Sequence, residues 1–219
     1  MQGVIQFLDD LKKNNNREWF QKNHGRYEES RNKILFITEL LINEIRSFDA
    51  DIPPLDPKEC QFRIYRDIRF SPDKTPYKTH FGSYIARGGR KSRRAGYYLH
   101  IDPDEGFMGG GIYLPEKDML KALRTAIYDQ PEVFRQIMEQ EKFKTLYPLI
   151  EGEKLKANPP GFPAYFEQIE LLRYKSYAFS TPISREQLAD SRFLDIAVDA
   201  FKTLSPANKF LNDALDNYL

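Results

Sequence analysis

The proline-rich segment Ile52–Pro57 divides the chain into parts with different hydrophobic periods. Before it, apolar residues recur every three or four positions, which predicts helices over Val4–Lys13 and Tyr27–Phe48. After it, apolar and polar residues alternate, which is typical of half-buried strands. Proline has no backbone N–H and disfavours helical geometry in the preceding residue, so no helix is expected to continue through this segment. The chain must therefore combine helices and strands in separate stretches.

Strand character is concentrated in residues 60–114. The four predicted strands are Phe62–Phe70, Thr79–Arg87, Ala95–Asp102 and Phe107–Leu114. The loops between them are too short for parallel crossover connections, so the expected sheet is an antiparallel meander.

Helical periodicity returns in residues 115–219, where one further strand is expected within residues 169–180. Two closing helices are predicted, Arg192–Leu204 and Pro206–Tyr218, with Ser205 as the cap between them. We expect one α+β domain over residues 1–219. In it, an antiparallel sheet of four to five strands packs with an N-terminal helical part, residues 1–56, and with the C-terminal helices.

Cysteine use and hydropathy indicate the compartment. Cys60 is the only cysteine, so no intramolecular disulfide can form, and a reducing cytoplasmic location is expected. The first ten residues lack the basic region of a signal peptide, and no stretch approaches the roughly 18 apolar residues of a membrane span. We predict neither a membrane partner nor a cofactor.

Positive charge is concentrated in the predicted sheet. The 219 residues include 33 Lys and Arg against 32 Asp and Glu, a net charge of +1. Residues 61–100 contain ten basic and two acidic residues, a net of +8, so the other 179 residues carry −7. Such a segment favours a partner that is anionic, because guanidinium groups bind phosphate and carboxylate through two parallel hydrogen bonds.

A small anionic ligand is the first hypothesis. Strand alternation would place Arg63, Tyr65 and Arg69 on one face of the sheet. Arg66 lies between Ile64 and Ile68 and would point toward the apolar side, where a buried guanidinium needs a carboxylate or a ligand beside it. The alternative for the basic residues is a set of internal salt bridges. The candidate ligand-binding residues are Arg63, Tyr65, Arg66, Arg69, Lys74, Tyr77, Lys78 and Tyr98.

Three motifs resemble a known family. The segment Phe62–Lys78, FRIYRDIRFSPDKTPYK, resembles the signature box of the bacterial and fungal family called domain of unknown function 2461. Gly96–His100 and Gly109–Pro115 are similar to its second and third blocks. The resemblance covers nearly the whole chain and implies an intracellular α+β conserved hypothetical protein, with no activity to transfer.

Candidate proton-transfer residues are His100 and Asp67, because histidine titrates near neutrality and a carboxylate can act as a base. The alternative for His80 and His100 is ordinary packing within strands. The three histidines, His24, His80 and His100, lack the spacing of known metal motifs, so no metal site is predicted. Gly109–Gly111 does not match a phosphate-binding loop and indicates close backbone approach instead.

Two other functions remain open. The predicted hairpin tip contains Arg87, Arg90, Lys91, Arg93 and Arg94, which could bind a nucleic-acid backbone with strand tyrosines stacking on bases. The alternative is a solvated tip. The third hypothesis is an interaction module whose basic surface docks on an acidic partner or on a second copy of the chain.

Overall fold

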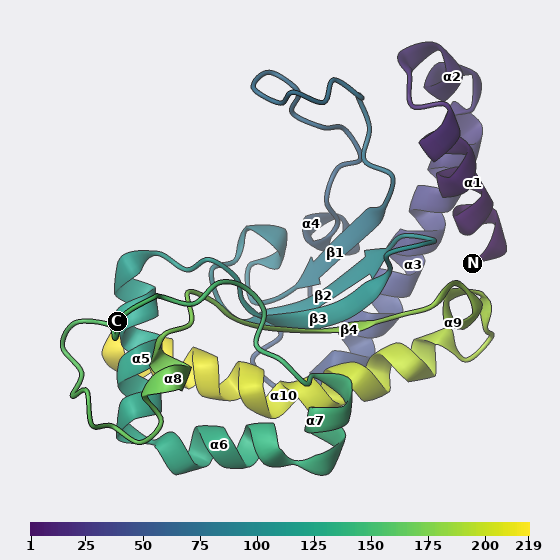
Figure 1. Ribbon diagram of the computed structural model, residues 1–219. Helices are drawn as coiled ribbons and strands as arrows, with labels where there is room; N and C mark the ends of the chain where they lie inside the picture. Colours follow the sequence, from purple (N-terminus) through teal and green to yellow (C-terminus); the bar gives the residue numbers. More distant parts are fainter.

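A four-stranded antiparallel sheet lies at the centre of the structure, a computed structural model that describes residues 1–219 (Figure 1). Its strands are β1 (Phe81–Ile85), β2 (Gly96–Ile101), β3 (Phe107–Ile112) and β4 (Tyr177–Pro182). They lie in the order β1-β2-β3-β4, and each neighbouring pair is antiparallel. The predicted α+β fold with an antiparallel meander is confirmed.

Two of the N-terminal helices, the first and the third, follow the predicted periodicity, and two shorter helices accompany them. They are α1 (Gln2–Lys13), α2 (Arg17–Lys22), α3 (His24–Arg46) and the short α4 (Pro57–Cys60). The side chain of Asn16 accepts a hydrogen bond from the backbone N–H of Trp19, which caps α2. Helix α3 packs on the sheet, where the hydroxyls of Thr38 and Ser83 form a buried hydrogen bond of 2.9 Å.

The C-terminal half contains six helices and the last strand. The helices are α5 (Lys117–Asp129), α6 (Pro131–Glu139), α7 (Glu141–Leu146), α8 (Ile169–Leu172), α9 (Arg185–Ala189) and α10 (Phe193–Tyr218). The strand expected within residues 169–180 begins only at Tyr177, because the first part of that segment forms α8. No helix of the protein combines the length and the apolar character that crossing a bilayer requires.

Helix α10 corrects the prediction of two closing helices. It is continuous across Pro206, although an interior proline removes a helix hydrogen bond and costs about 3 kcal/mol. Tertiary contacts on both sides of Pro206 hold it together. Leu204 and Ala207 are buried, and the amide of Asn208 donates to the carbonyl oxygen of Gly96 at 2.9 Å.

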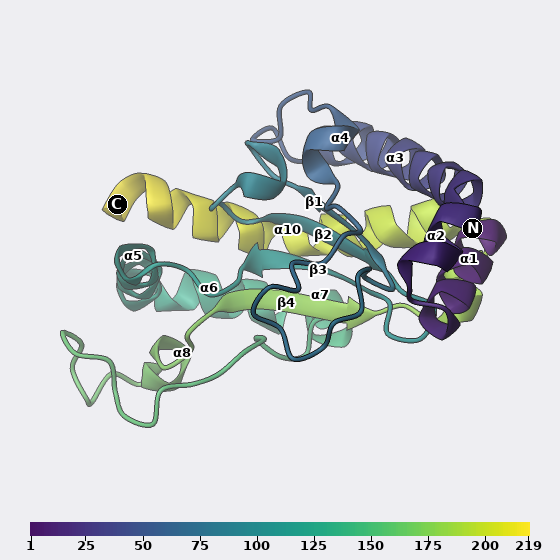
Figure 2. The same ribbon diagram turned by 90° about the horizontal axis from the view of Figure 1, so that it is seen from above.

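The two faces of the sheet have different environments. Helices α3 and α10 cover one face, on which Tyr97, Leu99 and Ile101 of β2 are buried. Tyr98 and His100 project from the opposite face and are only partly buried. Figure 2 looks onto that opposite face, over which a long loop passes. This face is the one available to a ligand.

The long loop corrects the first predicted strand. Residues 62–78, here called the arm, project from the sheet and contain only the isolated bridge between Tyr65 and Tyr77 (Figure 1). Alternation in Phe62–Phe70 does not produce a continuous strand, because its pairing with the returning half of the arm extends over a single bridge and Phe70 at its end is 92% exposed. Asp67 and Asp73 instead accept hydrogen bonds from backbone N–H groups two residues on, which competes with a strand ladder.

Candidate functional site

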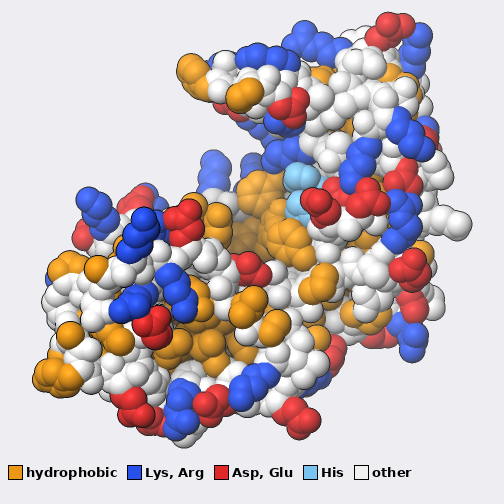
Figure 3. Space-filling model, viewed as in Figure 1, with side chains coloured by type: hydrophobic (Ala, Val, Ile, Leu, Met, Phe, Trp, Pro, Cys, Tyr) orange, Lys and Arg blue, Asp and Glu red, His pale blue; other side chains and the backbone are white.

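A groove of about 790 Å³ lies over the open face of the sheet, between the base of the arm and the connection from β1 to β2. In Figure 3 it is the hollow with hydrophobic side chains in orange and histidine side chains in pale blue at its edge. Its floor is formed by residues with small or no side chains, and its walls are aromatic and basic. The floor consists of Gly109, Gly110, Gly111, Ala178 and Ser180.

The glycines of β3 leave this floor without side chains. A Cβ at Gly109 would lie 2.2 Å from the carbonyl oxygen of Phe179, and Gly111 has a φ of 91°. The backbones of β3 and β4 therefore approach each other more closely than side chains would allow. This is the close backbone approach expected from the sequence, and it leaves space above the strands.

Two tyrosines form the wall nearest β1. The hydroxyl of Tyr84 lies 2.7 Å from the carbonyl oxygen of Arg94 and 3.1 Å from that of Gly111, so it ties the β1–β2 connection to β3. Tyr98 lies opposite both Tyr84 and Gly109 in the register of the sheet. Burial raises the pKa of Tyr98 to about 12, so its hydroxyl is protonated at neutral pH.

The basic residues do not lie in the strands, which corrects the prediction of a basic sheet. All ten lie in the arm or in the β1–β2 connection, on either side of the open face. Within the arm, Arg66 forms an ion pair with Asp73, and Arg69 forms one of 2.7 Å with Asp67. The ammonium of Lys74 donates to a backbone carbonyl of the arm. Arg66 therefore has the carboxylate partner that its sequence context requires.

Three arginines of the β1–β2 connection also have partners within the protein. Arg90 donates to two backbone carbonyls, and Arg93 and Arg94 form ion pairs with carboxylates at N–O distances of 2.7 and 2.6 Å. The partners are, in order, the carbonyls of Lys58 and Glu59, the carboxylate of Glu116 and the carboxylate of Asp216. Most of the positive charge that lines the groove is thus neutralised locally.

Lys78 and Arg63 differ from the other basic residues of the arm. Neither forms a side-chain hydrogen bond or an ion pair. Lys78 is partly buried at the groove, with its ammonium 5.6 Å from the ring centroid of Phe62. Burial and the nearby charge of Arg63 lower the pKa of Lys78. Arg63 is exposed and is not among the residues that line the groove, but its charge acts on Lys78, and neither cation forms an ion pair within the protein.

Three other predicted residues lie outside the groove. Tyr77 is buried at the base of the arm and stacks on Phe20 with ring centroids 3.9 Å apart, and Tyr65 packs beside it. Asp67 remains in the arm, where the hydrogen bond from Arg69 lowers its pKa. Asp67 does not line the groove, so we do not propose it as a proton-transfer residue.

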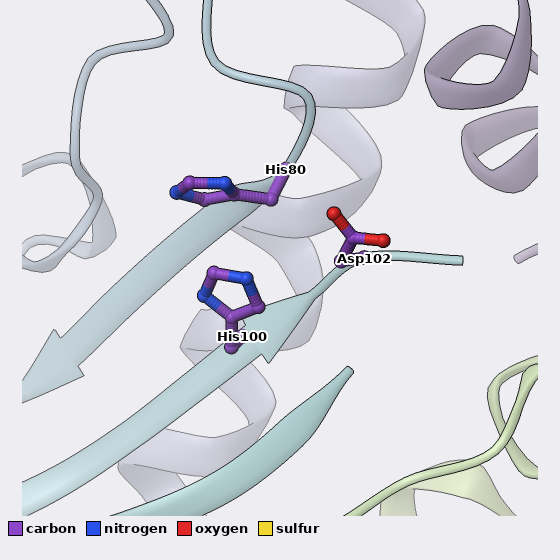
Figure 4. A group of neighbouring side chains, drawn as sticks. All are labelled: His80, His100 and Asp102. Atoms are coloured by element: carbon purple, nitrogen blue, oxygen red, sulfur yellow. The ribbon is translucent and has the colours of Figure 1, made fainter. Parts of the chain in front are cut away.

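A cluster of donor atoms lies at the edge of the groove (Figure 4). His80 immediately precedes β1, His100 belongs to β2, and Asp102 follows β2. The centroids of the two imidazole rings lie 4.1 Å apart, and one nitrogen of each ring and one oxygen of Asp102 lie within 4.8 Å of one another. His100 also stacks on Phe107, which lines the groove, at 4.7 Å.

The two imidazoles of the cluster are uncharged at neutral pH. Burial and the neighbouring His100 lower the pKa of His80 to about 4, and burial lowers the pKa of His100 as well. Burial acts to raise the pKa of Asp102, but hydrogen bonds from Lys12 and from backbone N–H groups outweigh it and lower that pKa. The cluster therefore presents two neutral imidazoles beside one carboxylate.

Asp102 is not among the site residues predicted from the sequence, and no pairing of it with His80 was predicted. The β1–β2 register, in which Phe81 lies opposite Ile101, brings His80 next to Asp102. Alternation along β2 could have placed His100 and Asp102 on one side. The position of His80 beside Asp102 could be predicted only from the register of β1 and β2.

The comparisons with known proteins identify the family. The model of the family described as conserved hypothetical protein (DUF2461) matches residues 3–210. The curated proteins and the solved structures contain no match to the chain. The match covers almost the entire sequence, including the arm, the glycine floor and the histidine cluster, and it confirms the resemblance found in the three motifs. The chain therefore belongs to the DUF2461 family of conserved hypothetical proteins.

Proposed function

We propose that the protein binds a small anionic molecule in the groove, with the anionic group between Lys78 and Arg63. The observation that carries this proposal is that neither of these two cations forms an ion pair, although their charges act on each other, whereas Arg66, Arg69 and Arg94 are each paired with a carboxylate. Two uncompensated positive charges beside a partly buried surface are unfavourable until an anion joins them.

The rest of the groove indicates what such a ligand looks like. Tyr98 and Phe62 offer aromatic edges, and the glycine floor allows a flat group to approach the backbone of β3 closely. Glu151 lies at the β4 side of the groove, where it accepts a hydrogen bond from Ser180. Its carboxylate disfavours a second negative charge there. The favoured ligand has a phosphate, carboxylate or sulfonate at one end and an apolar or planar body.

The paired arginines favour this proposal over nucleic-acid binding. A nucleic-acid clamp needs cations free to replace counter-ions along a phosphate backbone. In the β1–β2 connection, Arg93 and Arg94 are bound to carboxylates and Arg90 to backbone carbonyls, which leaves Arg87 and Lys91. The proposed location is the cytoplasm, a choice supported by Cys60 being the only cysteine and a buried free thiol.

Titration with 8-anilinonaphthalene-1-sulfonate tests the proposal, because this fluorescent molecule combines one sulfonate with an aromatic body. Lys78→Met and Arg63→Met each remove one charge-assisted contact, worth about 1–2 kcal/mol, and should weaken binding by about 5- to 30-fold. Lys91→Met is the matched control, because Lys91 is an exposed lysine outside the groove with no ion pair.

The expected result is a large loss of affinity for Lys78→Met, little change for Lys91→Met, and competition by inorganic phosphate in the wild-type protein. Far-UV circular dichroism checks that each variant is folded. Equal affinities of the Lys78→Met and Lys91→Met variants would refute the proposed anion site, and so would a lack of competition by phosphate.

A further inference from the structure

We propose that His80, His100 and Asp102 bind a divalent transition-metal ion at the edge of the groove. The three side chains come from one side of the β1–β2 pair, and their donor atoms lie within 4.8 Å of one another (Figure 4). Two imidazoles and one carboxylate form a ligand set that proteins use for zinc and related ions. This site is separate from the Lys78–Arg63 pair and does not require a ligand there.

Asp102 supplies the strongest evidence. Its side chain is only 6% exposed. All three hydrogen bonds to its carboxylate end on Oδ1: one from the ammonium of Lys12 at 2.7 Å and two from the backbone N–H groups of Asp104 and Glu105 at 2.9 and 3.2 Å. Oδ2 accepts none. Oδ2 is therefore free to coordinate a metal ion, while the hydrogen bonds to Oδ1 fix the orientation of the carboxylate.

The histidines are also arranged to act as ligands. The hydroxyl of Tyr98 lies 3.1 Å from Nδ1 of His100, which leaves Nε2 available. A hydrogen bond to the second ring nitrogen is the usual way in which proteins orient a metal-binding histidine. His80 forms no hydrogen bond through either ring nitrogen, so it can turn toward an ion without losing one.

The geometry requires a small adjustment. Metal–nitrogen distances of about 2.1 Å place neighbouring ligand atoms about 3.0–3.5 Å apart. The present separations of up to 4.8 Å therefore have to close by about 1–2 Å, which rotation of the two rings can supply. His80 lies in a bend before β1, where such a rotation disturbs no ladder hydrogen bond.

The charge around the cluster selects the class of metal. The two positive charges of Lys12 and Lys78 are offset by the two negative charges of Asp102 and Asp104. The net charge around the two histidines is therefore close to zero. Calcium and magnesium prefer oxygen ligands, of which the cluster provides only the carboxylate of Asp102. An ion that bonds strongly to imidazole, such as Zn²⁺ or Co²⁺, fits it better. Three protein ligands leave a coordination position for water at the groove.

Cobalt titration of the full chain, purified without a histidine tag, tests the proposal. Co²⁺ bound by nitrogen and oxygen ligands in a site of low coordination number absorbs visible light more strongly than hydrated Co²⁺. We expect saturation at one equivalent. His80→Gln and His100→Gln should each weaken binding at least tenfold, whereas His24→Gln, the matched control at the remaining histidine, should bind as the wild type does.

A second measurement works without any variant. In long-range ¹H–¹⁵N spectra of the wild-type protein, Zn²⁺ should shift the ring nitrogens of His80 and His100 and leave those of His24 unchanged. Circular dichroism checks the fold of the variants, and if one is unfolded the spectra decide. The proposal is overturned by an absence of saturable binding, by unchanged affinity in His80→Gln, or by an equal response of all three histidines.

Discussion

Replacing Asn212 with alanine should destabilise the protein, because two backbone groups would lose their hydrogen-bond partners. Asn212 lies in α10, is 4% exposed and bonds to both backbone groups of Ala95, just before β2. It accepts from the N–H of Ala95 at 2.9 Å and donates to the carbonyl oxygen at 3.2 Å. Ala95 precedes the strand, so the ladder does not supply these bonds.

The magnitude follows from the two groups left without partners. An unsatisfied buried backbone group costs about 1–3 kcal/mol, so the pair costs about 2–6 kcal/mol. Alanine gains about 0.5 kcal/mol in helix propensity over asparagine. We therefore expect Asn212→Ala to lower the free energy of unfolding by about 2–5 kcal/mol.

The neighbouring Asn208 is the control. Its amide donates to the carbonyl oxygen of Gly96, but its own Oδ1 is buried without a partner. Asn208→Ala loses one bond and removes one unsatisfied atom, two effects of similar size, so its net cost should be about 0–1 kcal/mol. Both variants are measured by urea unfolding followed by circular dichroism, with ΔG extrapolated linearly. Equal losses in the two variants, or a loss below about 1 kcal/mol for Asn212→Ala, would refute the reasoning.

Three further predictions concern single residues. Gly111→Ala should lower the free energy of unfolding by about 3 kcal/mol or more, because the backbone of Gly111 is left-handed and a Cβ would lie 2.2 Å from the carbonyl oxygen of Tyr177. A loss below about 1 kcal/mol in urea unfolding would contradict this prediction. The thiol of Cys60, whose pKa burial raises to about 11, should react with dithionitrobenzoate only after unfolding, and labelling of the native protein at about pH 8 would show the opposite. Hydrogen bonds from the backbone N–H of Thr75 and from the side chain of Arg66 lower the pKa of Asp73 to about 2. A ¹³C titration should show that pKa in the wild type and a higher pKa in Arg66→Ala. An unchanged pKa in the variant would contradict the ion pair. Because the folded pKa lies below the unfolded one, this carboxylate stabilises the protein above about pH 4, and the contribution is lost as the pH falls toward 2.

Elements with strong local signals were predicted well. The apolar spacing before Ile52 and the alternation in Ala95–Asp102 correspond to α1, α3 and β2. The capping box at the start of α9 is likewise local, because it joins Ser184 to Gln187, three residues further along the chain. These features depend on residues close together in the chain, which is why a single sequence is enough to predict them.

The errors have the opposite character. Phe62–Phe70 alternates like a strand but has no strand beside it, so local hydrogen bonds of the two aspartates shape the arm instead. Pro206 should end a helix, yet burial on both sides keeps α10 continuous. In both cases tertiary contacts, or their absence, outweigh a local preference.

The candidate site shows the same division. The sequence by itself determined the family, the α+β class and the segment in which the positive charge is concentrated, because these follow from residue type and local order. Only the tertiary structure decided which cations are neutralised, since Arg94 meets a carboxylate 122 residues away while Lys78 meets none. It also brought His80 to Asp102 through the β1–β2 register. Charge pairing and metal coordination depend on distances of a few ångströms between residues far apart in the chain, and the packed fold alone sets those distances.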